Sequence, residues 1–176
     1  LRLPGWLAVD YAERAERLAI GGGIATGFPE IKELVDGLAL ASGRAIENPA
    51  VRSKLADWYA KSAGLKNTSA RAMTALSKGE MPGPENSIGK LVAGGMMQDI
   101  AKFALDLQGL GGVIVDPQLA AHSARLQAML LRSPAVRIEG GTDQILRNII
   151  AERVLGLPEE LRADKGIPFS KIPSGN

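Results

Sequence analysis

The chain has 176 residues, enough for one domain with a sizeable core, and it contains no cysteine, which excludes disulfides, thiol catalysis and cysteine metal sites. Hydrophobic residues make up 45% and aromatic residues only 4%, so the core is aliphatic, as in packed helices. The 21 basic and 19 acidic residues are mixed along the chain, and no apolar run approaches the roughly 18 residues of a membrane span, so nucleic-acid and membrane partners are not expected.

The first residue is Leu and no signal-peptide pattern follows, so we expect a fragment or a processed piece, and the absence of cysteine is compatible with a cytoplasmic location. Residues 11–41 show apolar residues at helical spacing. Pro29 should kink or break this helix. Gly21, Gly22 and Gly23 each cost about 1 kcal/mol in a helix, which favours close approach of another helix or a ligand there.

Two long helices are predicted next. Asn48 is a suitable N-cap with Pro49 at the first helical position, and apolar residues then step by three and four to about residue 79. The seam predicted for this helix includes Met73 and Leu76. After a short proline-bearing link, a second helix covers about 85–107, and the short link favours an antiparallel pair.

A shorter helix is predicted after Pro117 and before Pro134. An extended segment from residue 137 then reaches Gly140 and Gly141, where the backbone turns into a helix capped by Thr142 and stopped at residues 156–158. A glycine turn that feeds a helix N-terminus can hold an anion, although most such turns are only helix starts.

Together these elements predict an all-α fold, an antiparallel four-helix bundle with an additional C-terminal helix, and no strand pair. The bundle domain is expected to cover residues 1–158, and an extended tail residues 159–176.

The run from residue 137 to residue 158 resembles the C-terminal signature of the acyl-CoA dehydrogenase family, and the order of elements from about residue 11 agrees with it. The resemblance implies bound FAD, an acyl-CoA substrate oxidised to the 2-enoyl-CoA, transfer of electrons to an electron-transfer flavoprotein, and a homo- or hetero-tetramer of like subunits. The N-terminal helical domain and middle β-domain of the family are absent from the chain, so the fragment alone is expected to be inactive.

The base that removes the α-proton is a carboxylate in this family. Many members place it directly before the Gly-Thr pair, where this chain has Gly140. Others place it in a Glu-Arg pair on the first helix of the domain, which here corresponds to Glu16 and Arg17, with Arg17 near the acyl-CoA or a neighbouring carboxylate. Glu16 is therefore the predicted base; it could instead be a solvated surface carboxylate, and Glu139, one place out of register, is the rival.

The family contacts the flavin of a neighbouring subunit through a Gln-x-Leu-Gly-Gly turn after the third helix, which implies cofactor contacts from Gln108, Gly111 and Gly112. Thr142 and Gln144 stand where the last helix contacts the flavin. The alternative for the residue-108 turn is an ordinary helix C-cap. The usual Asn-Gly-aromatic continuation is replaced by apolar residues at positions 113–115.

A further departure concerns an arginine that grips the flavin pyrophosphate in the family, because here Arg44 is displaced and the accompanying Phe is missing. Together with Gly140, this departure leaves open a non-catalytic structural subunit of a heteromeric acyl-CoA dehydrogenase. His122 is the only histidine and is expected to be a surface or packing residue, without metal-binding company.

Overall fold

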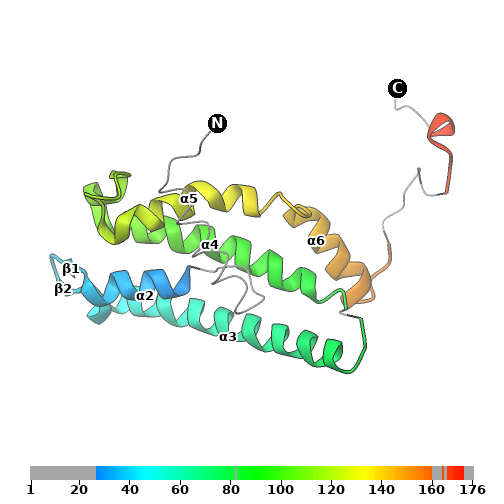
Figure 1. Ribbon diagram of the computed structural model, residues 1–176, viewed down its shortest axis with the longest axis horizontal. Coiled ribbons are helices and arrows are strands. Elements are labelled where there is room, and N and C mark those ends of the chain that lie inside the picture. The colour runs from blue at the N-terminus through cyan, green and yellow to red at the C-terminus, as the bar shows by residue number, and fades with distance from the viewer. Residues whose placement is uncertain (1–26, 82, 160–163, 165, 173–176) are drawn as a thin grey trace.

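The computed structural model describes residues 27–81, 83–159, 164 and 166–172. Glu16, Arg17 and the run of three glycines at 21–23 lie outside the described residues. Four helices run side by side in alternating directions: α2 (Phe28–Gly37), α3 (Pro49–Ser77), α4 (Asn86–Gln108) and α5 (Arg125–Val136) (Figure 1). A fifth helix, α6 (Asp143–Ile149), continues as a π-helical turn, Ile150–Val154. The predicted all-α bundle with an additional C-terminal helix is confirmed.

Two helix starts follow directly from the sequence. Asn48 caps α3, since its Oδ1 accepts hydrogen bonds from the amides of Ala50 (2.9 Å) and Val51 (3.3 Å). Helix α2 begins with Pro29 in its first turn, after Gly27 with φ +80°. A Cβ at Gly27 would lie 2.6 Å from Met129 Sδ, so glycine also allows this end of α2 to approach α5.

The core forms around α4, which contacts α2, α3, α5 and α6. Small and apolar residues of α4 are fully buried, and the Phe103 ring on this helix meets the buried Trp58 of α3 edge-on, with 5.3 Å between the ring centroids. Ile31 of α2 and Leu126 of α5 are also completely buried. Helix α4 is therefore the central helix, against which the other helices pack, including those that hold the candidate site.

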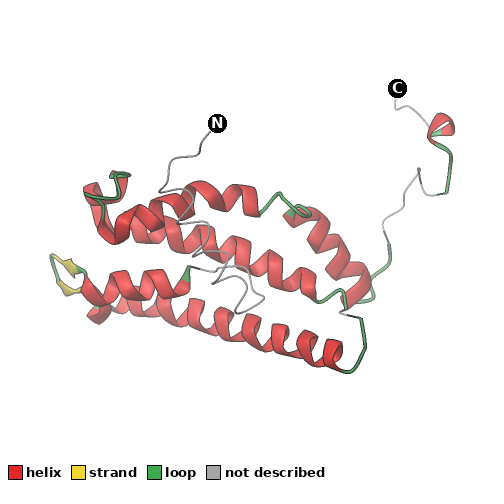
Figure 2. Cartoon of the chain, in the orientation of Figure 1, coloured by secondary structure: helices red, strands yellow, loops and turns green. Residues whose placement is uncertain are grey.

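The predicted absence of a strand pair is wrong for the loop between α2 and α3. Two-residue strands, β1 (Ala39–Leu40) and β2 (Gly43–Arg44), pair antiparallel there, the only strands within the described residues (Figure 2). The hairpin closes because Gly43 adopts φ +119°, which residues with a side chain rarely do.

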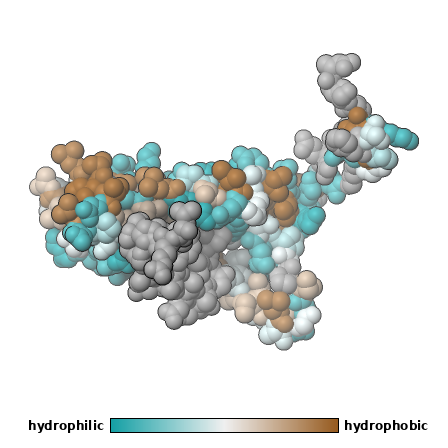
Figure 3. Space-filling model, turned by 45° about the horizontal axis from the view of Figure 1, so that its top comes forward, coloured by the Kyte–Doolittle hydropathy of each residue, from teal (hydrophilic) through white to brown (hydrophobic). Residues whose placement is uncertain are grey.

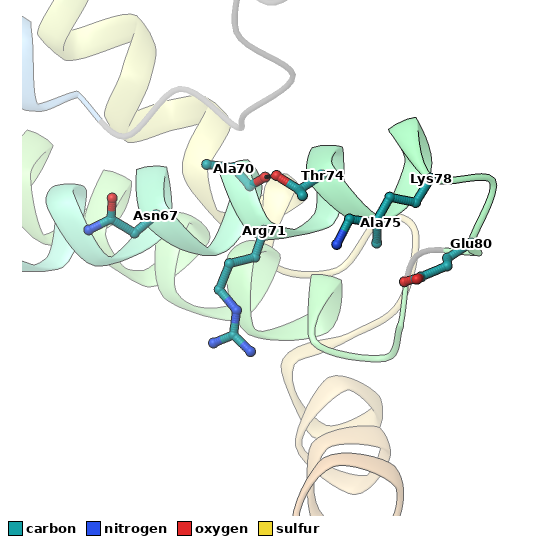
Figure 4. A pocket seen from close by; sticks show the side chains of 7 residues that line it. All are labelled: Asn67, Ala70, Arg71, Thr74, Ala75, Lys78 and Glu80. Atoms are coloured by element: carbon teal, nitrogen blue, oxygen red, sulfur yellow. Dashed lines mark hydrogen bonds between the residues drawn. The ribbon is translucent and has the colours of Figure 1, made fainter.

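The predicted seam of α3 is wrong at its C-terminal end, at Met73 and Leu76. Met73 is 63% exposed and Leu76 45%, whereas Ala72 is buried. An open depression lies along this end of α3 (Figure 4) and is lined by Asn67, Ala70, Arg71, Thr74, Ala75, Lys78 and Glu80. The inward face is thus set one residue away from the predicted apolar line.

Helix α5 also differs from the prediction at both ends. It begins at Arg125, after three successive residues with positive φ, His122, Ser123 and Ala124, and it continues through Pro134 instead of stopping before it. Proline lacks the amide that would bond to the carbonyl of Leu130; the hydroxyl of Ser133 donates to that carbonyl instead, at 2.9 Å. The local replacement explains why the helix tolerates the proline.

The tail beyond residue 159 is described only in part, with a short 3₁₀ turn at Phe169–Lys171. The domain boundary at residue 158 therefore stays a prediction. Among the helices of the described ranges, none combines the length and the apolar character needed to cross a membrane.

Candidate functional site

The segment 137–143, here called the glycine-threonine turn, follows the end of α5 as a turn instead of forming the predicted extended segment. The amide of Glu139 still donates to the carbonyl of Ala135 at 2.8 Å, as in a helix. Gly140 (φ +59°) and Gly141 (φ +108°) then lead the chain into α6, and the amide of Asp143 donates to the carbonyl of Arg137 at 3.2 Å. The turn is therefore a closed loop between two helices.

Arg137 ties the two ends of this turn together and fixes them on α4. Its Nε and one terminal nitrogen lie 2.7 and 2.6 Å from Oδ2 of Asp143, and its other terminal nitrogen donates to Oε1 of Gln98 at 2.6 Å. Asp143 has a side chain only 8% exposed, and the pairing with Arg137 compensates the cost of burying its carboxylate. Lys90 Nζ donates to the carbonyl of Gly141, a second tie to α4.

Thr142 caps α6 as predicted. Its Oγ1 accepts a hydrogen bond from the amide of Ile145 at 3.3 Å, and its carbonyl accepts from Leu146 at 2.9 Å. The side chain of Gln144 is exposed and makes no hydrogen bond within the described part of the chain. A flavin role for Thr142 and Gln144 stays a prediction.

The rival base, Glu139, is engaged elsewhere. A terminal nitrogen of Arg132 lies 2.6 and 2.8 Å from its two carboxylate oxygens, and both side chains are about half exposed. This surface pair holds the carboxylate on the outside of α5.

The second candidate segment, residues 108–113, is here called the helix-end turn. Gly109 ends α4 with φ +56°, as a C-cap glycine does, and the side-chain amide of Gln108 donates to the carbonyl of Ala104 at 3.0 Å. A Cβ on the buried Gly112 would overlap the Leu105 carbonyl, whereas the nearest atom to a Cβ on Gly111 would be 4.0 Å away. Close packing against Leu105 thus explains why residue 112 is a glycine. At Gly111 no neighbouring atom occupies the space of a side chain, so its backbone is accessible.

Large apolar side chains are exposed beside the helix-end turn. Leu110 is 89% exposed, Val113 76%, Val115 65% and Leu119 74%. They fall in the stretch between α4 and α5, and hydrophobic residues gather on that end of the molecule in Figure 3. We call these four residues the apolar loop.

The two turns lie toward opposite ends of α4 (Figure 1). That helix has 23 residues and is therefore about 35 Å long. The glycine-threonine turn is tied to Lys90 and Gln98, whereas the helix-end turn follows its last residue, Gln108. One chain therefore does not bring its two predicted sets of flavin contacts together.

Two further candidates make local contacts. Arg44 donates to the carbonyl of Asp36 at 3.4 Å and lies 3.7 Å from Glu47, exposed at the hairpin. His122 Nδ1 lies 3.4 Å from Glu33 Oε1 on α2, a position that fits the predicted packing role. The described residues include no group of three side chains that could hold a metal ion.

The sequence reasoning did not identify the network of Lys90, Gln98, Arg137 and Asp143. Arg137 lies six positions before Asp143, with two glycines between them, and this spacing was a local signal for their ion pair. Nothing local marks Gln98 or Lys90, because they come from another helix.

Comparisons with known proteins identify the family of this chain. The family description "Acyl-CoA dehydrogenase, C-terminal domain" matches residues 4–155, and the chain belongs to the acyl-CoA dehydrogenase family as this domain. It is 34% identical over 125 residues to acyl-CoA dehydrogenase IpdE1 of Mycolicibacterium smegmatis, and 30% identical over 124 residues to IpdE1 of Mycobacterium tuberculosis. These matches cover 71% and 67% of this chain but only 30% and 29% of the relatives, so the chain spans about a third of their length.

Solved structures share the fold. The ChsE4-ChsE5 complex from Mycobacterium tuberculosis matches with a TM-score of 0.64 and 24% identity, over 76% of this chain and 35% of that one. Butyryl-CoA dehydrogenase from Megasphaera elsdenii matches with a TM-score of 0.59 and 15% identity, over 73% and 32%. A protein named "Tcur3481-Tcur3483 steroid ACAD" matches with a TM-score of 0.62 and 19% identity, over 76% and 34%.

Proposed function

We propose that the chain is the C-terminal helical domain of an FAD-dependent acyl-CoA dehydrogenase. The reaction removes the α-proton and the β-hydrogen of an acyl-CoA thioester and yields the 2-enoyl-CoA, and the electrons pass to an electron-transfer flavoprotein. The observation that carries this proposal is the glycine-threonine turn, a Thr-capped helix start in the family's signature position, within a chain that matches the domain over residues 4–155. A cytoplasmic location remains a prediction.

The residues present fit a flavin. At the glycine-threonine turn, Gln144 offers an exposed amide that can donate and accept, beside the Thr142 cap. At the helix-end turn, Gly111 leaves the backbone open, and Gln108 keeps its side-chain oxygen available. Gly112 is needed for packing against Leu105, so it supports the shape of the turn and not a direct contact.

The separation of the two turns supports an assembly of subunits. Because they lie toward opposite ends of α4, about 35 Å long, we expect each chain to contact its own flavin through Thr142 and Gln144 and a neighbour's flavin through Gln108 and Gly111. A tetramer of like subunits provides such neighbours. The exposed apolar loop beside Gln108 is consistent with a buried position in that tetramer.

Bound FAD supplies the two-electron acceptor for the β-hydrogen. The protein supplies the base, and Glu16 is the proposed one: its carboxylate takes the α-proton of the thioester. Arg17 is proposed to hold the acyl-CoA or a neighbouring carboxylate. Gly140 has no side chain to serve as a base, and Glu139 is paired with Arg132, which favours a base from the first helix of the domain.

The test is anaerobic bleaching of the flavin in the purified full-length protein by a panel of acyl-CoAs, from short straight chains to a steroid side chain. We expect the parent to bleach with at least one of them and Glu16→Gln to bleach at least a hundredfold more slowly at equal flavin content. A variant as fast as the parent would remove Glu16 from the mechanism.

The second candidate is a non-catalytic structural subunit of a heteromeric acyl-CoA dehydrogenase. It is favoured by Gly140 at one base position and by Arg44, whose contacts are to Asp36 at the end of α2 and to Glu47. A purified homo-oligomer with one flavin per chain supports the catalytic subunit. A protein that holds no flavin until a second type of subunit is added supports the structural one.

A further inference from the structure

We propose that Arg137 is a positioning residue for flavin binding, which holds the glycine-threonine turn in its shape through Asp143 and Gln98. The inference rests on the proposed function, because the flavin contact of Thr142 and Gln144 belongs to that proposal. Arg137 itself acts through the turn and touches neither flavin nor substrate.

The guanidinium of Arg137 uses all three of its nitrogens. Nε and one terminal nitrogen bind the same carboxylate oxygen of Asp143, at 2.7 and 2.6 Å, and the other terminal nitrogen binds Gln98 at 2.6 Å. The planar guanidinium makes these contacts from fixed positions, whereas the ammonium of a lysine is a single charged group at the end of a flexible stem. Arginine is thus the residue that joins the end of α5, the start of α6 and the middle of α4.

The turn needs such a tie because its own backbone is permissive. Gly140 and Gly141, both with positive φ, lie between the paired residues, and glycine has access to more backbone conformations than any other residue. The tie of Lys90 to the Gly141 carbonyl fixes the middle of the turn and leaves the ends to Arg137. The direction in which Thr142 presents the start of α6 therefore follows from the Arg137 pair.

The packing around Arg137 is built for its stem. A Cβ on Gly94 of α4 would lie 3.3 Å from Cγ of Arg137, so the absence of a side chain at position 94 makes room for it. Asp143 is 8% exposed and sits in the first turn of α6. Without Arg137 this buried carboxylate would lose its cationic partner, and the two ends of the turn would lose the contact that joins them.

The experiment measures FAD affinity by titrating flavin into the deflavinated full-length protein, for the parent, Arg137→Gln, Arg137→Lys and Asp143→Asn. Hydrogen exchange of the peptide covering residues 138–146 is followed in the flavin-free state. We expect Arg137→Gln and Asp143→Asn to weaken FAD binding at least tenfold and to speed exchange in that peptide, with Arg137→Lys in between. Exchange within α3 should stay unchanged, because α3 makes none of these contacts.

The matched control is Arg132→Gln, which removes an exposed arginine-carboxylate pair from the outer side of the same turn. It should bind FAD within twofold of the parent. Titrations are made at a temperature well below the thermal unfolding midpoint of every variant, so that a loss of global stability cannot lower the measured FAD affinity. If the parent binds FAD and the variants Arg137→Gln and Asp143→Asn bind it within twofold of the parent, the inference about Arg137 is wrong and the proposed function stands. If the parent binds no FAD, both the inference and the proposed function are wrong.

Discussion

The glycine-threonine turn and the helix-end turn both adjoin α4 and both contain adjacent glycines, but they are held in different ways. The first is fixed by charged and polar side chains: Arg137, Asp143, Gln98 and Lys90. The second is fixed by close backbone packing at Gly112 and is flanked by exposed apolar side chains. The first turn is therefore held by side chains of its own chain, whereas the second is bordered by apolar side chains that are exposed in the described part of the chain.

The largest expected effect tests the packing at the helix-end turn. Gly112→Ala places a methyl group against the backbone carbonyl of Leu105, which cannot move aside as a flexible side chain could. We expect a loss of about 3 kcal/mol in the free energy of unfolding, at the upper end for overpacking. Urea unfolding followed by circular dichroism measures it.

Gly111→Ala is the matched control, since the nearest atom to its Cβ would be 4.0 Å away, at ordinary contact distance. It should change stability by less than about 0.5 kcal/mol. Equal losses for the two alanines would mean that flexibility of the glycines, and not the contact with Leu105, sets the stability of this turn.

The next effect tests the ion pair of the glycine-threonine turn. Arg137→Ala leaves the Asp143 carboxylate, 8% exposed, without its partner. Removing one partner of a fully buried ion pair lowers the free energy of unfolding by about 3–5 kcal/mol. We expect a loss of about 2 kcal/mol here because water reaches Arg137, whose side chain is 40% exposed.

Arg132→Ala breaks the neighbouring surface pair with Glu139 and should cost less than about 1 kcal/mol in the same urea experiment. The two substitutions each remove one positive charge, so a difference between their effects on stability reports the burial of the partner carboxylate. If both substitutions cost the same, the exposure of the partner carboxylate does not decide the contribution of the pair.

The smallest effect concerns the apolar loop. Leu110→Gln should leave the free energy of unfolding within about 0.5 kcal/mol of the parent, because this side chain is 89% exposed and contributes little to the chain's own core. Leu126→Ala, at a fully buried position of α5, should cost about 3 kcal/mol in the same measurement. A large loss for Leu110→Gln would show that the loop packs on its own chain.

The sequence was sufficient for the helices whose ends carry local signals. The cap of Asn48, the proline at the start of α3 and the cap of Thr142 depend on residues within three positions of each other, so their hydrogen bonds could be predicted. The antiparallel arrangement of α3 and α4 followed from the short link between them.

The rest depended on contacts that are distant in sequence or on compensation that no propensity rule contains. Pro134 stays in α5 because the hydroxyl of Ser133 takes over the carbonyl of Leu130. Gln98 meets Arg137 across 39 positions of sequence, and no periodic pattern marks that pair. Met73 and Leu76 fit the helical period, yet the packing of α3 turns Ala72 inward instead.

Gly94 connects sequence variation on α4 with variation at the end of α5. Because its missing side chain accommodates the stem of Arg137, the cost of an alanine at position 94 depends on which residue occupies position 137. The two positions are expected to change together among homologous sequences, glycine with arginine and a larger residue only with a shorter partner. With such epistasis, the residues at positions 94 and 137 together would determine the shape of the glycine-threonine turn.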